Sequence, residues 1–159
     1  MATVKEPILY HWSALPVERL DSRPYKQGLG MKPNGLWFDC DEDWVRWCRA
    51  EEFGLPRLAF RHRVEVLDLT RILKLCTAED LAKFTLKFRQ SDNPYIWSID
   101  WPDIRDKFSG IIIAPYIWEC RLDDRAFWYY SWDCASGCVW DIGNIRLGPP
   151  EAMTDGGKP

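Results

Sequence analysis

The hydrophobic and polar positions along the chain predict short strands interrupted by a few short helices. Between residues 58 and 69, apolar residues and His62 alternate with charged residues, which is the period of a half-buried strand. The continuous apolar run at 111–114 is typical of a strand at the centre of a sheet. Shorter β-prone segments at 8–11 and 35–38 are also predicted to be strands.

The segment from 126 to 146 is expected to form two further strands joined by a kink. Residues 126–132 are almost wholly aromatic, and residues 138–146 alternate in polarity. Between them lies Asp133-Cys-Ala-Ser-Gly137, which combines a carboxylate, a hydroxyl and a glycine. This composition suits a turn or bulge at which a ligand can approach the backbone.

Capping signals and helical spacing predict the helices. Three acidic residues at 41–43 precede apolar residues one turn apart at 44–48, which indicates an amphipathic helix. Thr77-Ala-Glu-Asp80 is a capping signature for a helix that reaches about Arg89, and Asp100-Trp-Pro102 opens another that Gly110 ends. A single helical turn is also predicted at 17–20.

The order of these elements favours an α+β fold with largely antiparallel sheets, because strands and helices do not alternate regularly. The 159 residues suit one domain, which we assign to residues 1–147. Residues 21–34 have no periodicity and are expected to form a long loop that acts as a lid or binding rim. Residues 148–159 are rich in Gly and Pro and are expected to be a disordered tail.

Composition narrows the class of protein. Ten tryptophans are many for this length and point to an aromatic-lined cavity or partner surface. The net charge of -3 gives no electrostatic argument for a nucleic-acid partner. Since no apolar run reaches the length of a membrane span and the first residues lack the apolar segment of a signal peptide, the sequence predicts a soluble cytoplasmic protein that does not bind membranes.

The six cysteines contain no C-x-x-C pair and are expected to be reduced. Cys134 and Cys138 are too loosely spaced for a zinc site, and His11 and His62 are the only imidazoles. We therefore expect no metal.

Asp133 and His11 are the first candidates for chemistry. A carboxylate held among tryptophans and tyrosines lies in a low-dielectric wall, where it interacts strongly with a developing positive charge. The alternative for Asp133 is a turn cap. His11 ends a predicted strand and either binds a ligand or bonds a backbone carbonyl.

Three segments together resemble the signature strands of ADP-ribosyltransferases, in the branch that includes diphtheria toxin and the poly(ADP-ribose) polymerases. His11-Trp12-Ser13 resembles the motif His-Gly-Ser/Thr. The segment 35–48, which begins Gly-Leu-Trp-Phe and ends Trp-Cys, resembles a strand Gly-Ile-Tyr-Phe followed by a helix that ends in Tyr-Cys. The segment 136–147 resembles the strand pattern Glu-x-x-Val-x-x-x-x-Gln-Val-x-Leu. The order and rough separations of the three also agree.

The resemblance implies an ADP-ribosyltransferase-like fold with two sheets around a central cleft that binds NAD as a substrate. It assigns catalysis to Asp133, His11 and Ser136. It assigns NAD binding to the following residues: His11, Ser13, Gly35, Trp37, Trp44 and Tyr129. Trp37 stands where the family has tyrosine, and the family's glutamate falls on Ser136, so that either Asp133 or Ser136 takes its place.

The activity implied is mono-ADP-ribosyl transfer from NAD to a macromolecule, with a protein favoured over a nucleic acid as acceptor. Such a compact domain suits a toxin, an effector or a protein of phage–bacterial conflict, with an inhibitor or antitoxin as partner. The alternative is a catalytically inactive module of the same fold that binds a nucleotide or a partner protein. A third interpretation is a tryptophan-rich protein whose aromatic residues serve only its core.

Overall fold

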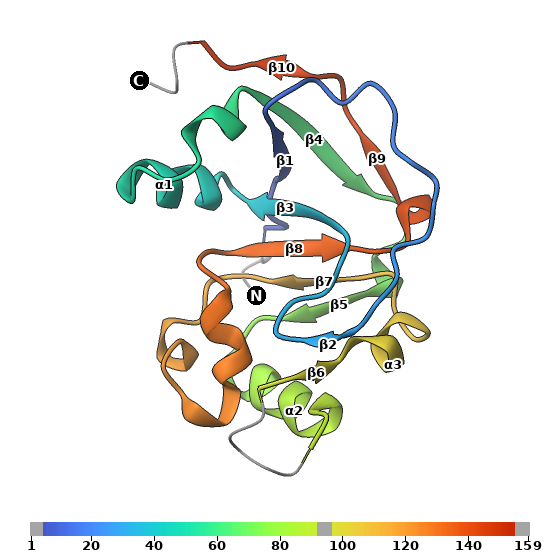
Figure 1. Ribbon diagram of the computed structural model, residues 1–159, viewed down its shortest axis with the longest axis vertical. Helices are drawn as coiled ribbons and strands as arrows, with labels where there is room; N and C mark the ends of the chain where they lie inside the picture. The colour runs from blue at the N-terminus through green and yellow to red at the C-terminus, as the bar shows by residue number, and fades with distance from the viewer. Residues whose placement is uncertain (1–4, 92–96, 155–159) are drawn as a thin grey trace.

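The computed structural model describes residues 5–91 and 97–154 and has a mixed α+β fold. One eight-stranded, mainly antiparallel sheet runs through the molecule, and a small two-stranded sheet lies beside it (Figure 1). Among the described residues, no helix has both the length and the apolar character needed to cross a membrane.

The large sheet has the strand order β10-β4-β1-β3-β8-β7-β5, and β9 also pairs with β4. Within the described residues, β5 and β7 form its parallel pair, and the other strand pairs of this sheet are antiparallel. Its strands are β1 Leu9–Ser13, β3 Leu36–Cys40, β4 Phe60–Val66, β5 Ile72–Leu75, β7 Gly110–Ile113, β8 Ser136–Val139, β9 Ile145–Leu147 and β10 Glu151–Ala152. The small sheet pairs β2, Leu29–Gly30, with β6, Ile99–Asp100.

The helices predicted after residues 41–43, 77 and 100 are present, but the last is shorter than predicted and the first has no side-chain capping bond. Their bounds are α1 Asp43–Ala50, α2 Ala78–Phe88 and α3 Trp101–Arg105. Thr77 and Asp80 form a complete capping box at α2, and Asp100 caps α3 by accepting a bond from the Asp103 amide. Residues 5–91 and 97–154 also contain five short 3-10 helices: η1 Leu55–Leu58, η2 Leu69–Arg71, η3 Trp118–Cys120, η4 Asp124–Ser131 and η5 Ile142–Asn144.

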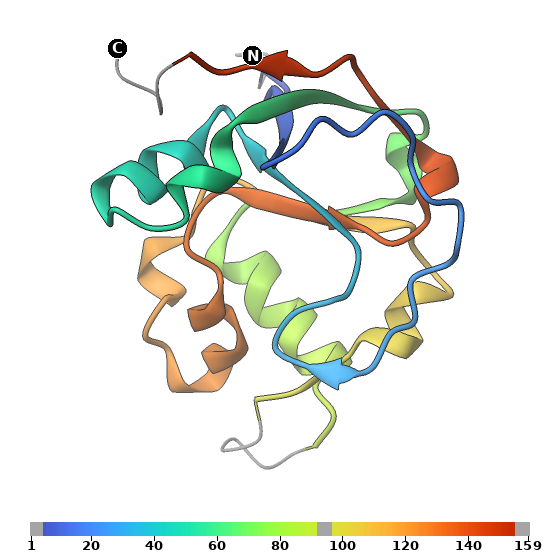
Figure 2. The same cartoon turned by 45° about the horizontal axis from the view of Figure 1, so that its top comes forward.

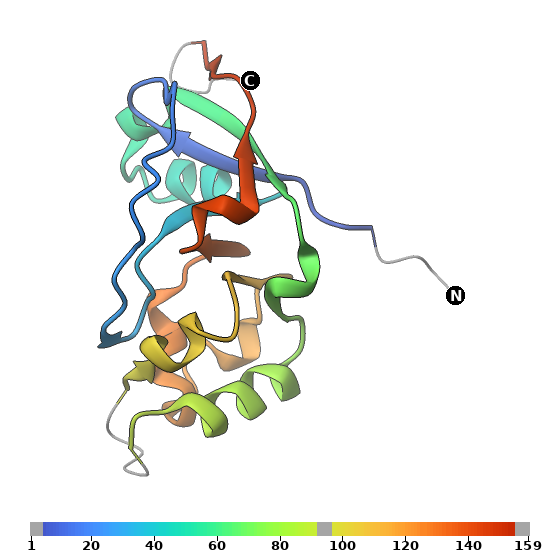
Figure 3. The same ribbon diagram turned by 90° about the vertical axis from the view of Figure 1, so that its right-hand side faces the viewer.

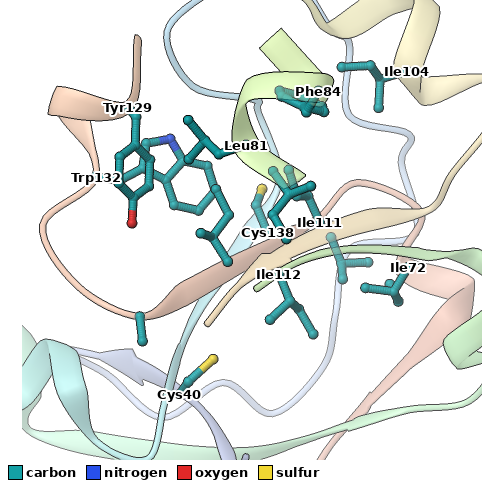
Figure 4. Packing of buried hydrophobic residues seen from close by; sticks show 14 of the residues in the cluster. Cys40, Ile72, Leu81, Phe84, Ile104, Ile111, Ile112, Tyr129, Trp132 and Cys138 are labelled. Carbon is teal, nitrogen blue, oxygen red and sulfur yellow. The ribbon is translucent and has the colours of Figure 1, made fainter. Parts of the chain in front are cut away.

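The main core lies between the centre of the sheet and α2. Ile111 and Cys138 are paired across β7 and β8 and are fully buried, and Leu81 and Phe84 of α2 belong to the same cluster (Figure 4). Burying a side chain of this size stabilises the fold by about 1.5–3 kcal/mol. Figure 3 shows α2 and α3 at one end of the molecule, with β1, β4 and α1 toward the other.

The prediction of a strand at 126–132 is wrong, because residues 126–131 belong to the 3-10 helix η4 and Trp132 caps its end. Trp128, Tyr129 and Trp132 are all buried, which is a helical spacing and not an alternation. The Trp128 indole donates to Thr85 Oγ1 of α2 at 2.8 Å. Packing against α2 therefore overrides the β propensity of the aromatic run.

Three further segments differ from the structure predicted for them. The predicted strand over 138–146 is divided into β8 and β9 by η5, and residues 136–137 belong to β8 instead of a turn. No helical turn forms at 17–20; this stretch is part of the irregular connection that runs along the outside of the sheet to β2 (Figure 2). The segment after Leu147 contributes β10, which pairs with β4, whereas residues 155–159 lie outside the described part of the chain.

Candidate functional site

A cavity of about 250 Å³ lies where β3, α1 and the start of β8 meet. Its lining includes four of the residues singled out in the sequence, from two separate segments. The lining residues are Lys32, Trp37, Phe38, Trp44, Trp132, Asp133, Cys134 and Ser136.

The register of β3 and β8 sets one wall of this cavity. Trp37 is paired with Cys138 and Asp39 with Ser136. Because residues directly opposite each other in an antiparallel pair share a face, Trp37 and Ser136 point to the same side of the sheet. Gly137, between Ser136 and Cys138 in β8, faces the other side of the sheet, where an added Cβ would lie 2.6 Å from the Phe38 ring.

The Trp37 ring lies between two neighbours. The Trp132 ring meets it edge-on with 4.9 Å between centroids, and the Lys32 ammonium lies 5.3 Å from its centroid. The second contact has the geometry of a cation–π interaction. Burial of its ammonium lowers the pKa of Lys32, although much of the side chain is exposed, and the nearby Asp133 carboxylate opposes that shift. Trp37 thus offers its ring to a cation.

Trp44 enters the cavity from the first turn of α1. Its ring stacks on Trp47 at 5.0 Å with an interplanar angle of 9°, so one of its faces is already covered. The Asp39 carboxylate accepts a hydrogen bond from the Trp44 amide at 3.1 Å, which connects the start of the helix to β3.

The segment before β8 is held by hydrogen bonds to the corner between β3 and α1. The Ala135 amide donates to the Asp43 carboxylate at 2.8 Å, and the Ala135 carbonyl accepts from the Cys40 amide at 3.0 Å. The Ser136 hydroxyl donates to the Cys134 carbonyl at 3.0 Å. These bonds fix the backbone that presents Asp133 and Ser136 to the cavity.

Asp133 lies beside two cations, Arg121 and Lys32. Arg121 Nη2 is 3.7 Å from Asp133 Oδ1, and the two side chains are 26% and 25% exposed to solvent. Arg121 also donates to the Tyr116 hydroxyl at 2.9 Å, which anchors its guanidinium. Asp133 is therefore a partly exposed, paired carboxylate at the cavity wall.

His11 and Ser13 do not line this cavity. Trp12 bonds Asp39 on the face of α1, and alternation along β1 turns His11 to the opposite face, where its ring lies 6.3 Å from that of His62. The His11 Nδ1 is 2.7 Å from the Trp37 carbonyl, and burial lowers its pKa. The Ser13 hydroxyl donates to the Leu15 carbonyl at 2.7 Å.

Gly35 and Tyr129 are also absent from the cavity lining. A Cβ on Gly35 would lie 2.5 Å from the Val139 carbonyl oxygen, so β8 occupies the space left by the missing side chain. Tyr129 is fully buried behind Trp132, and its hydroxyl accepts from the Ile117 amide at 2.9 Å. Figure 4 shows Tyr129 and Trp132 side by side, and it is Trp132 that lies against Trp37, where the sequence had suggested Tyr129.

Asp39 and Lys32 belong to this region but were not selected from the sequence. Asp39 is only 1% exposed, and burial raises its pKa to about 7. The only signal in the sequence was a carboxylate inside an otherwise apolar strand, Leu-Trp-Phe-Asp-Cys. Lys32 gave no signal, since it lies in a loop without periodicity.

Elsewhere in the described residues, a metal centre is absent and a second cavity is present. No group of three or more His, Cys, Asp or Glu side chains in the described ranges is arranged to hold a metal ion. A larger apolar cavity of about 320 Å³ lies between α2 and η4. None of the candidate catalytic or NAD-binding residues lines this cavity.

Comparisons with models of protein families, with curated proteins and with solved structures returned no match to this chain.

Proposed function

We propose that this chain is an NAD-dependent mono-ADP-ribosyltransferase with an ADP-ribosyltransferase-like fold. The observation that carries the proposal is the convergence of Trp37, Trp44, Asp133 and Ser136 on one cavity. In addition, β1, β3 and β8, which hold the first resembling segment and the beginnings of the other two, are neighbours in the sheet. The cavity has the size and the aromatic walls that suit a single flat ring, and we assign it to the nicotinamide group of NAD.

Recognition of nicotinamide would use its positive charge. The oxidised nicotinamide ring is a pyridinium cation, and the Trp37 ring already lies under an ammonium group at 5.3 Å. A pyridinium that replaces the Lys32 ammonium would gain the same cation–π attraction and a stacked contact as well. Lys32 would then be free to approach the pyrophosphate of NAD.

The chemistry follows from the charges at the wall. When the bond from nicotinamide to ribose breaks, its electron pair goes to the ring nitrogen and positive charge develops on the ribose, as in glycoside hydrolysis. Asp133 would stabilise that cation, and Ser136 would bond the ribose or the incoming acceptor. His11 would act only indirectly, through its bond to the Trp37 carbonyl. We favour a protein side chain as the acceptor.

A second candidate function is a non-catalytic module that binds a nucleotide or a partner protein in the same cavity. The observation in its favour is the ion pair between Arg121 and Asp133, because a carboxylate held by a guanidinium is less available to a developing cation. The serine at the position of the family's glutamate favours this candidate too.

Calorimetric titration of the protein with NAD, followed by an assay of nicotinamide release, distinguishes the two. Binding with release supports the transferase. Binding without release supports the module. Absence of both excludes the cavity as an NAD site. Glu65→Gln is a suitable control, because Glu65 is an exposed carboxylate on β4 away from the cavity lining.

A further inference from the structure

Two buried side-chain atoms in the described residues have no hydrogen-bond partner, and both belong to the region of the cavity. They are Asp39 Oδ1 and Trp132 Nε1. Trp132 lines the cavity, and Asp39 lies directly beside it in β3. Since buried polar atoms are nearly always paired, two unpaired atoms at one place point to a function for them.

Asp39 is held by one of its oxygens and not by the other. Its Oδ2 accepts from Trp12 Nε1 at 3.0 Å and from the Trp44 amide at 3.1 Å. The carboxyl group is therefore fixed in orientation. The Val45 amide is also close enough to favour its charged form, while Oδ1 itself has no hydrogen-bond partner.

Three immediate neighbours of Asp39 line the cavity. Phe38 precedes it in β3, Trp44 donates its backbone N–H to the Asp39 carboxylate, and Ser136 is its partner across the strand pair. Side chains directly opposite each other in antiparallel strands have Cβ atoms about 4.5–5.5 Å apart. Ser136 thus lines the cavity and lies next to the buried carboxyl group across the strand pair.

We propose that Asp39 is the proton acceptor of this site and that it acts through the Ser136 hydroxyl. The proposal rests on the proposed transferase function and adds a residue to it. Asp39 does not touch the substrate; it positions and deprotonates the group that does. Asp133 keeps its separate role of stabilising the ribose cation.

The proton balance of the step is simple. An acceptor, or water when NAD is hydrolysed, attacks the ribose carbon as the bond to nicotinamide breaks. The attacking oxygen passes its proton to Ser136 Oγ, and the hydroxyl proton of Ser136 passes to Asp39 Oδ1. To do so the Ser136 hydroxyl must turn away from the Cys134 carbonyl, to which it donates in the structure. The nicotinamide leaves as a neutral ring.

The groups around Asp39 leave it able to change its protonation near neutral pH. The groups that interact with it electrostatically are Glu42, Cys40, Cys48 and Cys134. None of them is a cation, and burial holds the pKa values of the three thiols above their usual range. Burial also raises the pKa of Asp39 to about 7, which suits a general base.

The alternative role for Asp39 is purely structural, as a tie between β3 and the start of α1. The two roles differ in what Asp39→Asn does. Asparagine keeps the shape and an oxygen for the Trp12 and Trp44 bonds, so a structural tie tolerates the change, whereas a proton acceptor does not.

The experiment measures NAD hydrolysis by the full chain as nicotinamide release from pH 5 to 9, with NAD affinity measured in parallel. We expect Asp39→Asn to lower kcat by about 10²-fold or more, with NAD affinity within about twofold of wild type. We expect the acid limb of the wild-type pH profile, near pH 7, to be lost in Asp39→Asn and in Ser136→Ala. It should persist in the Glu65→Gln control.

Several results overturn the proposal. An Asp39→Asn variant with wild-type kcat and pH profile excludes a proton acceptor at this position. If Asp39→Asn does not fold, Ser136→Ala decides, because an intact acid limb in that variant excludes the relay. Wild-type protein that binds NAD without releasing nicotinamide removes the transferase function itself, and this failure is recognised before any variant is made.

Discussion

Replacing Asp39 with asparagine should make the protein more stable at alkaline pH, even though the residue is hydrogen-bonded. In the folded chain the pKa of Asp39 is raised by burial from 3.8 to about 7. The folded state therefore binds more protons than the unfolded state between these values, and stability falls as pH rises through this range. Above pH 7 the cost of the buried charge is about 4 kcal/mol.

The measurable quantity is the difference in the free energy of unfolding between Asp39→Asn and wild type at two pH values. Asparagine introduces a buried N–H group. The free-energy cost of leaving this group without a partner does not depend on pH, so it cancels in the comparison. Between pH 5 and pH 8.5 we expect the difference to move by about 3 kcal/mol in favour of the variant. Urea unfolding followed by tryptophan fluorescence provides the assay. A difference that stays constant between the two pH values would refute the argument that Asp39 is a neutral group in the folded protein at acid pH.

Three further predictions concern the cavity and its support. Trp37→Ala should abolish measurable NAD binding by calorimetry while Trp37→Tyr stays close to wild type, because a tyrosine ring still stacks; normal binding by a folded Trp37→Ala excludes stacking on this ring. Oxidised NAD should bind about 2- to 30-fold more tightly than NADH, since only the oxidised ring is a cation; equal affinities would contradict a cation–π site. Asp133→Asn should lower nicotinamide release by about 10²- to 10³-fold with little change in NAD affinity, and Ser136→Ala should cost less; unchanged release in Asp133→Asn removes its assigned role.

His11 illustrates how a pattern in the sequence can identify a residue and leave its contact open. The resemblance in the sequence assigned His11 to NAD binding, and a bond to a backbone carbonyl was the alternative. With its ring bonded to the Trp37 carbonyl at 2.7 Å, we now expect His11→Ala to lower the free energy of unfolding by about 1–3 kcal/mol. Thermal unfolding checks this, and an unchanged melting temperature with weaker NAD binding would restore the ligand role.

The parts of the fold that could be predicted are those fixed by local chemistry. The capping box of Thr77 and Asp80 defines the start of α2, and the alternation around His62 defines β4, because both signals act within a few residues. The run from Phe127 to Trp132 could not be assigned in this way. Its aromatic residues favour strands, but their contacts with α2 and Tyr116 come from distant parts of the chain.

The same distinction holds for the candidate site. Trp37 and Trp44 were selected because they stand in a strand and helix of recognisable pattern, and both line the cavity. Asp39 could not be selected, because its importance comes from the pairing with Ser136, which lies 97 positions further along the chain. The position of Lys32 over the Trp37 ring likewise depends on how an irregular loop packs.

The most direct test of the central claim is the release of nicotinamide from NAD by the wild-type protein, compared with the Trp37→Ala variant at the same concentration. The account predicts saturable, enzyme-dependent release by wild type and its loss in the variant. Absence of release by correctly folded wild-type protein, or equal release by both proteins, would contradict it.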